Sequence, residues 1–246
     1  RFLSLLNAIR ENRCTNEIIN TLNSRYIPRI NPGDDEGYIR LTTHNIQAQR
    51  INQKKLDELP SQSYRFKATI EGDFPDYSYP TELELELKKG AQVMFVKNDI
   101  SGMHRYANGT IGRITNISHE GIEVMVNETG TRVSLEEAEW TNAKYRLDEE
   151  TKEIVEEVEG TFKQYPLKLA WAITVHKSQG LTFDKAIIDV SSSFAHGQAY
   201  VALSRCRTLE GLILSSPISA GAVISDSVID SFTDEQRRSV PTMEQC

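Results

Sequence analysis

The spacing of apolar residues changes twice along this chain, and these changes limit the folds that it can adopt. Before about Tyr64, a compact strand pattern, "YIRLTT", leads directly into an amphipathic stretch, "NIQAQRINQKKLDEL". Between about Tyr64 and Tyr165, short runs such as "LELEL", "AQVMFV", "TIGRITNI", "IEVMV" and "TRVSL" are separated by turn residues. Strand and helix patterns alternate again afterwards. Short runs with turns predict an all-β segment, and mixed periods predict α/β structure.

The simplest organisation is an α/β domain in two sequence pieces with a β domain inserted between them. The pieces are residues 1–63 and 165–220, the insert is 64–164, and a polar tail covers 221–246. Five to seven short strands favour a small barrel for the insert. Within it, "KYRLDEETKEIVEEVEG" predicts a hairpin closed by "DEET", which is too acidic to face DNA and is expected to face solvent or a protein.

Two local predictions refine the α/β pieces. The helix after "YIRLTT" is expected to turn Ile46, Ile51 and Leu59 toward the core, because these apolar residues recur near helical spacing. Residues 169–175, "LAWAITV", are apolar throughout and are compatible with either a strand or a helix.

Composition excludes several classes of protein. With 39% hydrophobic and 26% charged residues and apolar runs shorter than ten residues, the chain predicts neither a membrane span nor a secretory signal. A net charge of −7 argues against a wholly basic nucleic-acid-coating protein but allows a local basic strip. The three cysteines, Cys14, Cys206 and Cys246, fit no zinc spacing and predict a reducing, intracellular (cytoplasmic) location. Because Arg1 opens the chain within a predicted helix, we expect a piece of a longer protein.

Polar residues follow the predicted strand "YIRLTT" where the next helix begins. Thr43, His44 and Asn45 occupy this junction. Free backbone N–H groups and the helix dipole favour an anion at such a position. The alternative is that Thr43 or Asn45 serves only as a helix N-cap.

A second polar stretch, residues 176–180 or "HKSQG", follows the apolar run "LAWAITV". A Lys and a His beside an amide and a glycine can present donors to phosphate oxygens at the end of an element. A histidine near an apolar run can instead be a satisfied core residue. Five consecutive small, polar or basic residues favour the first interpretation.

The third stretch, "GQAYVALSRCRTLEGL", places Arg205 at the end of a helix of small residues. Such an arginine can extend its head group to water, or it can deliver a planar cation whose forked donors match a phosphate. No Gly-x-x-x-x-Gly-Lys-Ser/Thr occurs, so the chain carries no phosphate-binding P-loop of its own.

Taken together, these stretches resemble superfamily 1 DNA helicases of the Pif and RecD type over residues 2–218. "AITVHKSQGLTFDKAIIDV" and "QAYVALSRCRTLEGL" look like helicase motifs V and VI, and "LTTHNIQAQRIN" resembles motif IV. "LKKGAQVMFVKND" with "NGTIGRI" resembles the SH3-like barrel (domain 2B) inserted in the second RecA-like domain (2A). Thr182 stands where relatives of the UvrD kind carry Glu, which favours the Pif branch.

The resemblance implies a role for most of the polar residues. In such 5′-to-3′ helicases, ATP lies between two RecA-like lobes and single-stranded DNA crosses both. Arg205 matches the arginine finger that reaches the ATP γ-phosphate. Residues implied at the ATP cleft are Gln179, Gly180 and Lys177. Lys177 is implied to lie between this cleft and the DNA contacts. Residues implied at the DNA backbone are Thr43, His44, Asn45, Thr174 and His176. Ser178 receives no role.

The P-loop and the acidic magnesium motif of the family are absent from this sequence. The resemblance therefore implies the carboxyl-terminal half of a helicase, whose partners are single-stranded DNA and a missing N-terminal RecA-like lobe of the same chain. ATP and Mg²⁺ are expected as cofactors of the full-length protein. Neither they nor any other metal is expected on this half alone, which should hydrolyse no ATP.

The insert carries basic and aromatic residues near the loop "DISGMHRYANGT". Its predicted DNA contacts are Lys97, Arg105 and Arg113, with Lys88, Lys89 and Tyr106 nearby. Such a set can form a surface for single-stranded DNA, or it can be ordinary scattered surface charge.

Two other functions remain compatible with the sequence. One is a noncatalytic DNA- or protein-binding module that keeps a helicase-like fold. The other is the helicase half of a mobilisation or nuclease protein with a further catalytic domain.

Overall fold

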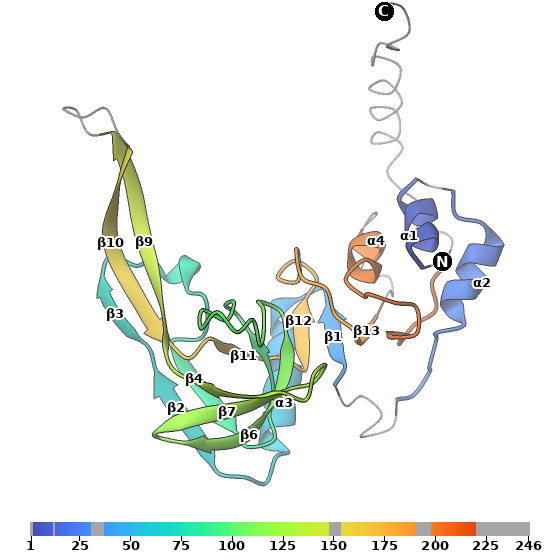
Figure 1. Ribbon diagram of the computed structural model, residues 1–246. Helices are drawn as coiled ribbons and strands as arrows, with labels where there is room; N and C mark the ends of the chain where they lie inside the picture. The colour runs from blue at the N-terminus through green and yellow to red at the C-terminus, as the bar shows by residue number, and fades with distance from the viewer. Residues whose placement is uncertain (1, 12, 31–36, 148–153, 190–197, 220–246) are drawn as a thin grey trace, which may run out of the picture. The chain divides into compact units, whose positions relative to one another are not determined.

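The computed structural model describes residues 2–11, 13–30, 37–147, 154–189 and 198–219 (Figure 1). The chain forms two compact units. Residues 1–48 and 173–246 make up the first, called the α/β unit, and residues 49–172 make up the second, called the β unit. The predicted polar tail, 221–246, lies outside the described residues.

The α/β unit is built on a four-stranded sheet whose strands are short and almost completely buried. Its strand order is β12 (Ala172–Thr174), β1 (Ile39–Thr42), β13 (Ala186–Ile188) and β14 (Leu212–Leu214). The β1–β13 and β13–β14 pairs are parallel. Continuous apolar strands of this kind are typical of parallel sheets covered by helices, and this sheet agrees with a RecA-like α/β domain.

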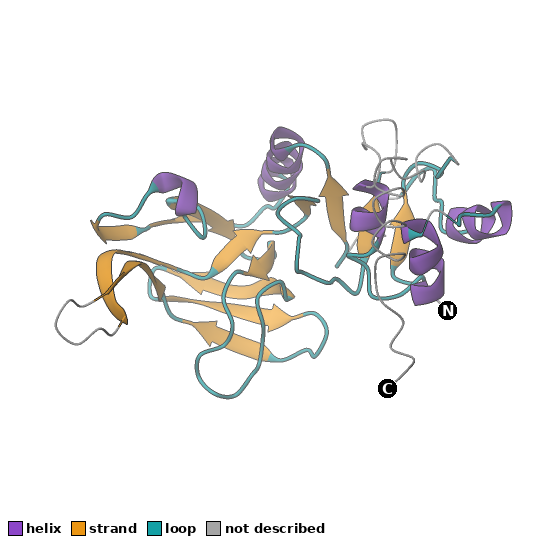
Figure 2. Cartoon of the chain, turned by 90° about the horizontal axis from the view of Figure 1, so that it is seen from above, coloured by secondary structure: helices purple, strands orange, loops and turns teal. Residues whose placement is uncertain are grey.

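Helices gather around these strands (Figure 2). They are α1 (Phe2–Arg10), α2 (Asn16–Asn23) and α4 (Gln198–Leu203). The helix predicted at the start of the chain is confirmed as α1. The hydroxyl oxygen of Thr15 caps α2 by accepting a hydrogen bond from the Ile18 amide at 3.4 Å, which satisfies one of the free donors of the first turn.

The prediction for the inward face of helix α3 (Asn45–Asp57) was wrong for Ile46, whose side chain is 72% exposed. The buried positions are Ala48 and Leu56, with Asn52 on the same stripe at intervals of four residues. Asn52 satisfies its amide with the backbone of Ala172, donating to its carbonyl at 2.9 Å and accepting from its N–H at 2.8 Å. Because the polar residue Asn52 lies on the buried face, the spacing of apolar residues alone did not identify that face.

The described part of the β unit contains ten strands, β2 to β11, and nine of them, β2 to β10, fall in the predicted insert, more than the five to seven predicted. A five-stranded antiparallel sheet has the order β11 (Leu167–Leu169), β5 (Gln92–Phe95), β6 (Ile111–Ser118), β7 (Gly121–Val126) and β8 (Arg132–Leu135). A second sheet pairs β2 (Ser63–Lys67) with β4 (Glu84–Lys88). A third has the order β3 (Thr69–Gly72), β10 (Ile154–Gln164) and β9 (Ala138–Leu147).

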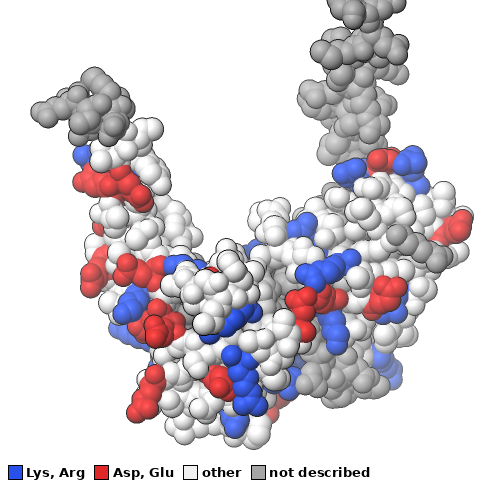
Figure 3. All heavy atoms as spheres, viewed as in Figure 1, with Lys and Arg blue, Asp and Glu red and all other residues white. Residues whose placement is uncertain are grey.

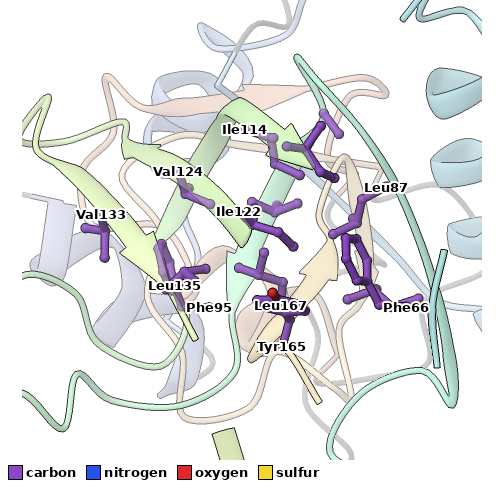
Figure 4. Packing of buried hydrophobic residues seen from close by; sticks show 14 of the residues in the cluster. Phe66, Leu87, Phe95, Ile114, Ile122, Val124, Val133, Leu135, Tyr165 and Leu167 are labelled. Carbon is purple, nitrogen blue, oxygen red and sulfur yellow. The ribbon is translucent and has the colours of Figure 1, made fainter. Parts of the chain in front are cut away.

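One apolar core joins the five-stranded and two-stranded sheets (Figure 4). Phe95 and Leu167 of the larger sheet and Leu87 of the smaller sheet are completely buried in it. Strand β7 alternates half-buried and buried residues along its whole length, as expected where one face of a strand packs on a core.

Strands β9 and β10 pair over their whole length, which confirms the arms of the predicted hairpin (Figure 1). The "DEET" turn, residues 148–151, lies outside the described residues.

The ambiguity at residues 169–175 is resolved as two strands, β11 and β12, with residues 170–171 between them. Among the described residues, no helix is long and apolar enough to cross a membrane.

Candidate functional site

The first two polar stretches meet at one end of the α/β sheet. The amide of Val175 donates a 2.9 Å hydrogen bond to the carbonyl of Thr42, so the ends of β12 and β1 lie side by side. Immediately after β1, the Thr43 hydroxyl oxygen lies 2.7 Å from His44 Nδ1, and His44 is exposed. Asn45, also exposed, begins α3. Two stretches about 130 residues apart in sequence thus form one polar edge.

A tight turn follows β12 and is called here the 175–180 turn. Thr174 is buried, and its hydroxyl oxygen accepts a 3.3 Å hydrogen bond from the amide of Lys177. Ser178 is completely buried, and its hydroxyl donates to the Val175 carbonyl at 2.7 Å. Gly180 adopts a left-handed conformation with φ of +78°, which favours glycine. The side chains left exposed are those of His176, Lys177 and Gln179.

Arg205 follows helix α4, and its guanidinium group is held in place by four hydrogen bonds. Nη1 donates to the carbonyls of Leu181 at 3.2 Å and Ser178 at 3.4 Å. Nε donates to the Val201 carbonyl at 3.1 Å, and Nη2 donates to the Ser204 hydroxyl at 3.0 Å. Arg205 therefore bridges α4 and the 175–180 turn.

All four acceptors of Arg205 are neutral. Among the described residues, no carboxylate forms an ion pair with Arg205, and neither residues 174–182 nor 198–207 contain an Asp or Glu. A half-buried guanidinium without a counter-ion attracts an anion, and its planar donors suit a phosphate. The absence of acidic residues from both stretches also means that they offer no carboxylate ligand for Mg²⁺.

The backbone joins the two stretches beyond the turn. The amide of Phe183 donates to the Arg205 carbonyl at 2.7 Å, and the amide of Arg207 donates to the Phe183 carbonyl at 2.9 Å. The guanidinium of Arg207, unlike that of Arg205, forms an ion pair with Asp184 at 2.7 Å. Cys206 is buried between these contacts, and burial raises the pKa of its thiol.

In the β unit, the structure gives internal partners to two of the predicted DNA contacts. Arg105 Nε donates to Asp99 Oδ2 at 2.9 Å and Nη2 donates to Oδ1 at 3.3 Å. The Asp99 side chain is only 1% exposed, and the hydrogen bond from Arg105 lowers the pKa of its carboxyl group far below the usual value. Lys97 donates to the Glu139 carbonyl and lies over the Trp140 ring at 4.9 Å.

The other members of that predicted surface are distributed among structural roles. Arg113 is half-buried on β6, in register with Gln92 of β5. Tyr106 stacks on Phe95 with ring centroids 4.0 Å apart. Lys88 donates to the Leu59 carbonyl at 3.0 Å. Sequence reasoning did not identify Asp99 as the partner of Arg105. The available signal was that the two residues lie six positions apart in one loop.

On the face shown in Figure 3, acidic side chains gather on the β9–β10 hairpin. On the β9–β10 hairpin, Lys144 pairs with Glu159 at 2.5 Å and Arg146 pairs with Glu157 at 3.0 Å.

Among the described residues, no cluster of three or more His, Cys, Asp or Glu side chains could hold a metal ion.

Comparisons with known proteins agree along nearly the whole chain. Human "ATP-dependent DNA helicase PIF1" is 35% identical over 220 residues, covering 86% of this chain and 32% of that protein. The structure of unliganded Pif1 from Bacteroides sp. is 38% identical with a TM-score of 0.88, covering 97% of this chain and 54% of that one. Bacteroides Pif1 bound to single-stranded DNA is 38% identical with a TM-score of 0.68, covering 96% and 54%. No family model matches the sequence. The chain spans about a third of the human relative and about half of the Bacteroides chain.

Proposed function

Because this chain belongs to the Pif1-like family of superfamily 1 helicases, we propose that it is the C-terminal motor half of an ATP-dependent 5′-to-3′ DNA helicase. In this proposal residues 1–63 and 165–220 form RecA-like domain 2A, and residues 64–164 form the inserted SH3-like domain 2B. A second RecA-like lobe supplies the P-loop and the acidic residues that hold Mg²⁺. Its substrates are ATP and DNA with a single-stranded region.

The observation that carries this proposal is the environment of Arg205. Its guanidinium is held at the end of α4 by neutral acceptors only, beside the exposed Lys177 and Gln179. An arginine finger stabilises the charge that develops on the transferred γ-phosphoryl group. Arg205 performs this role when the cleft closes on ATP. Gln179 and Gly180 line the same cleft, and Lys177 lies between this cleft and the bound DNA, where it contacts both.

The polar edge formed by the ends of β1 and β12 binds the DNA backbone. Thr43, His44, Asn45 and His176 supply donors there, and the support for this is that the Thr42–Val175 hydrogen bond brings their two stretches together. Thr174 contributes indirectly. Its buried hydroxyl oxygen accepts a hydrogen bond from the Lys177 amide and so fixes the position of that amide. Phosphate contacts of this kind position the strand without reading its sequence.

In the β unit, Lys97, Arg105 and Arg113 contribute to a second contact with single-stranded DNA. Arg105 acts mainly through its pairing with Asp99, which fixes the shape of the loop between β5 and β6. The protein acts inside the cell, where a reducing environment keeps Cys14 and Cys206 as free thiols.

The test is steady-state ATP hydrolysis by the complete protein, with and without oligo(dT), for the wild type, Arg205→Ala and Arg207→Ala. Arg207 is the matched control, since it lies two residues away but is paired with Asp184. We expect DNA-stimulated hydrolysis that Arg205→Ala lowers by about a thousandfold or more and that Arg207→Ala lowers by less than about tenfold. A well-folded protein without hydrolysis would instead support the noncatalytic binding module.

A further inference from the structure

Ser178 is completely buried in the middle of the exposed 175–180 turn. Its hydroxyl donates to the Val175 carbonyl at 2.7 Å, and its amide donates to the Thr174 carbonyl at 3.0 Å. The hydroxyl bond closes the turn on itself, and the amide bond fastens it to Thr174 at the end of strand β12. On either side of Ser178, Lys177 and Gln179 are exposed.

The carbonyl of Ser178 connects the turn to Arg205. It accepts a hydrogen bond from the Leu181 amide at 3.0 Å and a longer one from Arg205 Nη1 at 3.4 Å. The carbonyl of Leu181 accepts from the same nitrogen at 3.2 Å. A displacement of the turn therefore moves the Ser178 carbonyl directly, and it moves the Leu181 carbonyl through the hydrogen bond between the Leu181 amide and Ser178.

We propose that Ser178 is a positioning residue that couples DNA bound at the 175–180 turn to the orientation of Arg205. This inference rests on the proposed function and assigns a role to a completely buried residue to which the proposed function gives none. A strand that contacts His176 and Lys177 shifts the turn, the turn shifts the carbonyls of Ser178 and Leu181, and Arg205 exchanges these neutral acceptors for a phosphate. Ser178 transmits the shift because its buried hydroxyl makes the turn rigid.

Ser204 provides a matched control. Its hydroxyl donates to the Val201 carbonyl at 2.8 Å, as that of Ser178 donates to Val175, and it also accepts a hydrogen bond from Arg205. Ser204 belongs to the segment of α4 and Arg205, however, and its side-chain hydrogen bonds among the described residues stay within that segment. Loss of its hydroxyl weakens the hold on Arg205 without breaking the connection to the turn.

The experiment measures the ratio of DNA-stimulated to DNA-free ATP hydrolysis in the complete protein for the wild type, Ser178→Ala and Ser204→Ala. We expect Ser178→Ala to lower the ratio by at least about fivefold, the lower end of coupling between linked sites. Ser204→Ala should change both rates by the same factor and keep the ratio. A ratio that Ser178→Ala leaves unchanged, or that both variants lower equally, overturns the inference.

A second readout is independent of hydrolysis. In this chain, the Nε–H signal of Arg205 in a nitrogen-15 spectrum reports its hydrogen bond to Val201. We expect oligo(dT) to shift that signal in the wild type and in Ser204→Ala but not in a folded Ser178→Ala protein that still binds the oligonucleotide. If the wild type hydrolyses ATP, Arg205→Ala lowers hydrolysis by about a thousandfold or more and Ser178→Ala behaves as the wild type, only the coupling fails. If the wild type neither hydrolyses ATP nor binds oligo(dT), the proposed function fails and the coupling fails with it.

Discussion

The amide of Phe183 donates a 2.7 Å hydrogen bond to the carbonyl of Arg205. The amide of Arg207 in turn donates a hydrogen bond to the Phe183 carbonyl, so Phe183 and Cys206 form a parallel bridge. The segment that carries the exposed 175–180 turn is thereby attached to the segment that carries Arg205. Changes at this junction should affect stability and function together.

Gly211 tests the packing behind the junction. A Cβ atom at this position would lie 1.8 Å from the Asp184 carbonyl oxygen, so the backbone has to move to accept it. We expect Gly211→Ala to lower the free energy of unfolding by about 3 kcal/mol, the upper end for overpacking. Gly121→Ala is the control, because nothing lies within 4 Å of the added atom, and its effect should stay within about 1 kcal/mol. Urea denaturation that gives equal effects for both would contradict this packing.

The orientation of α3 predicts opposite outcomes for two apolar residues. Leu56 is completely buried and Ile46 is 72% exposed. Leu56→Ala should lower the free energy of unfolding by about 2–5 kcal/mol because it leaves a cavity. Ile46→Ala should change it by no more than about 0.5 kcal/mol, as for other exposed positions. Chemical denaturation of both variants decides the matter, and a larger loss at Ile46 would mean that the helix is rotated.

The Asp99–Arg105 pair predicts a stability that depends on pH. At pH 7, Asp99→Asn should cost about 2–3 kcal/mol, since hydrogen bonds to charged groups each contribute about 1.5–3 kcal/mol. The pKa of Asp99 is lowered in the folded protein, first by the Arg105 hydrogen bond. Its contribution is therefore complete above the unfolded pKa of about 3.9 and declines as the pH falls below that value.

Denaturation at pH 7 and pH 3 tests this prediction, with Glu84→Gln as the control. Glu84 is 64% exposed and lies 3.8 Å from Arg65, and such surface pairs contribute between about 0 and 1 kcal/mol. The difference between wild type and Asp99→Asn should narrow at pH 3. A difference that widens on acidification would show that the carboxylate of Asp99 does not stabilise the fold.

Lys177 should contribute to DNA binding through charge. We expect this chain to bind oligo(dT) weakly and in a salt-dependent manner, measured by fluorescence anisotropy. Lys177→Ala should reduce the slope of log affinity against log salt by about 0.7, the value for one phosphate contact on a single strand. Lys185→Ala is the control, because Lys185 lies over the Tyr38 ring at 5.4 Å instead. If the slope for Lys177→Ala equals that of the wild type, Lys177 makes no phosphate contact with the DNA.

Sequence patterns predicted most elements of both units because strand and helix periods are local properties. They also located the polar stretches at strand ends, where parallel strands bring distant residues to one edge. They failed at Ile46, because the buried stripe of α3 includes Asn52, whose partner Ala172 is distant in sequence. They also could not foresee that Asp99 is buried against Arg105, since burial of a loop acid depends on tertiary contacts.

The most direct test of the central claim is single-turnover hydrolysis of ATP by the complete protein on oligo(dT), comparing wild type with Arg205→Ala. This measurement separates the chemical step from nucleotide binding. An arginine finger predicts that the hydrolysis rate falls by about a thousandfold or more while ATP affinity changes little. A loss confined to ATP affinity, or a rate indifferent to Arg205, would contradict the assignment of this chain as the lobe that supplies the finger.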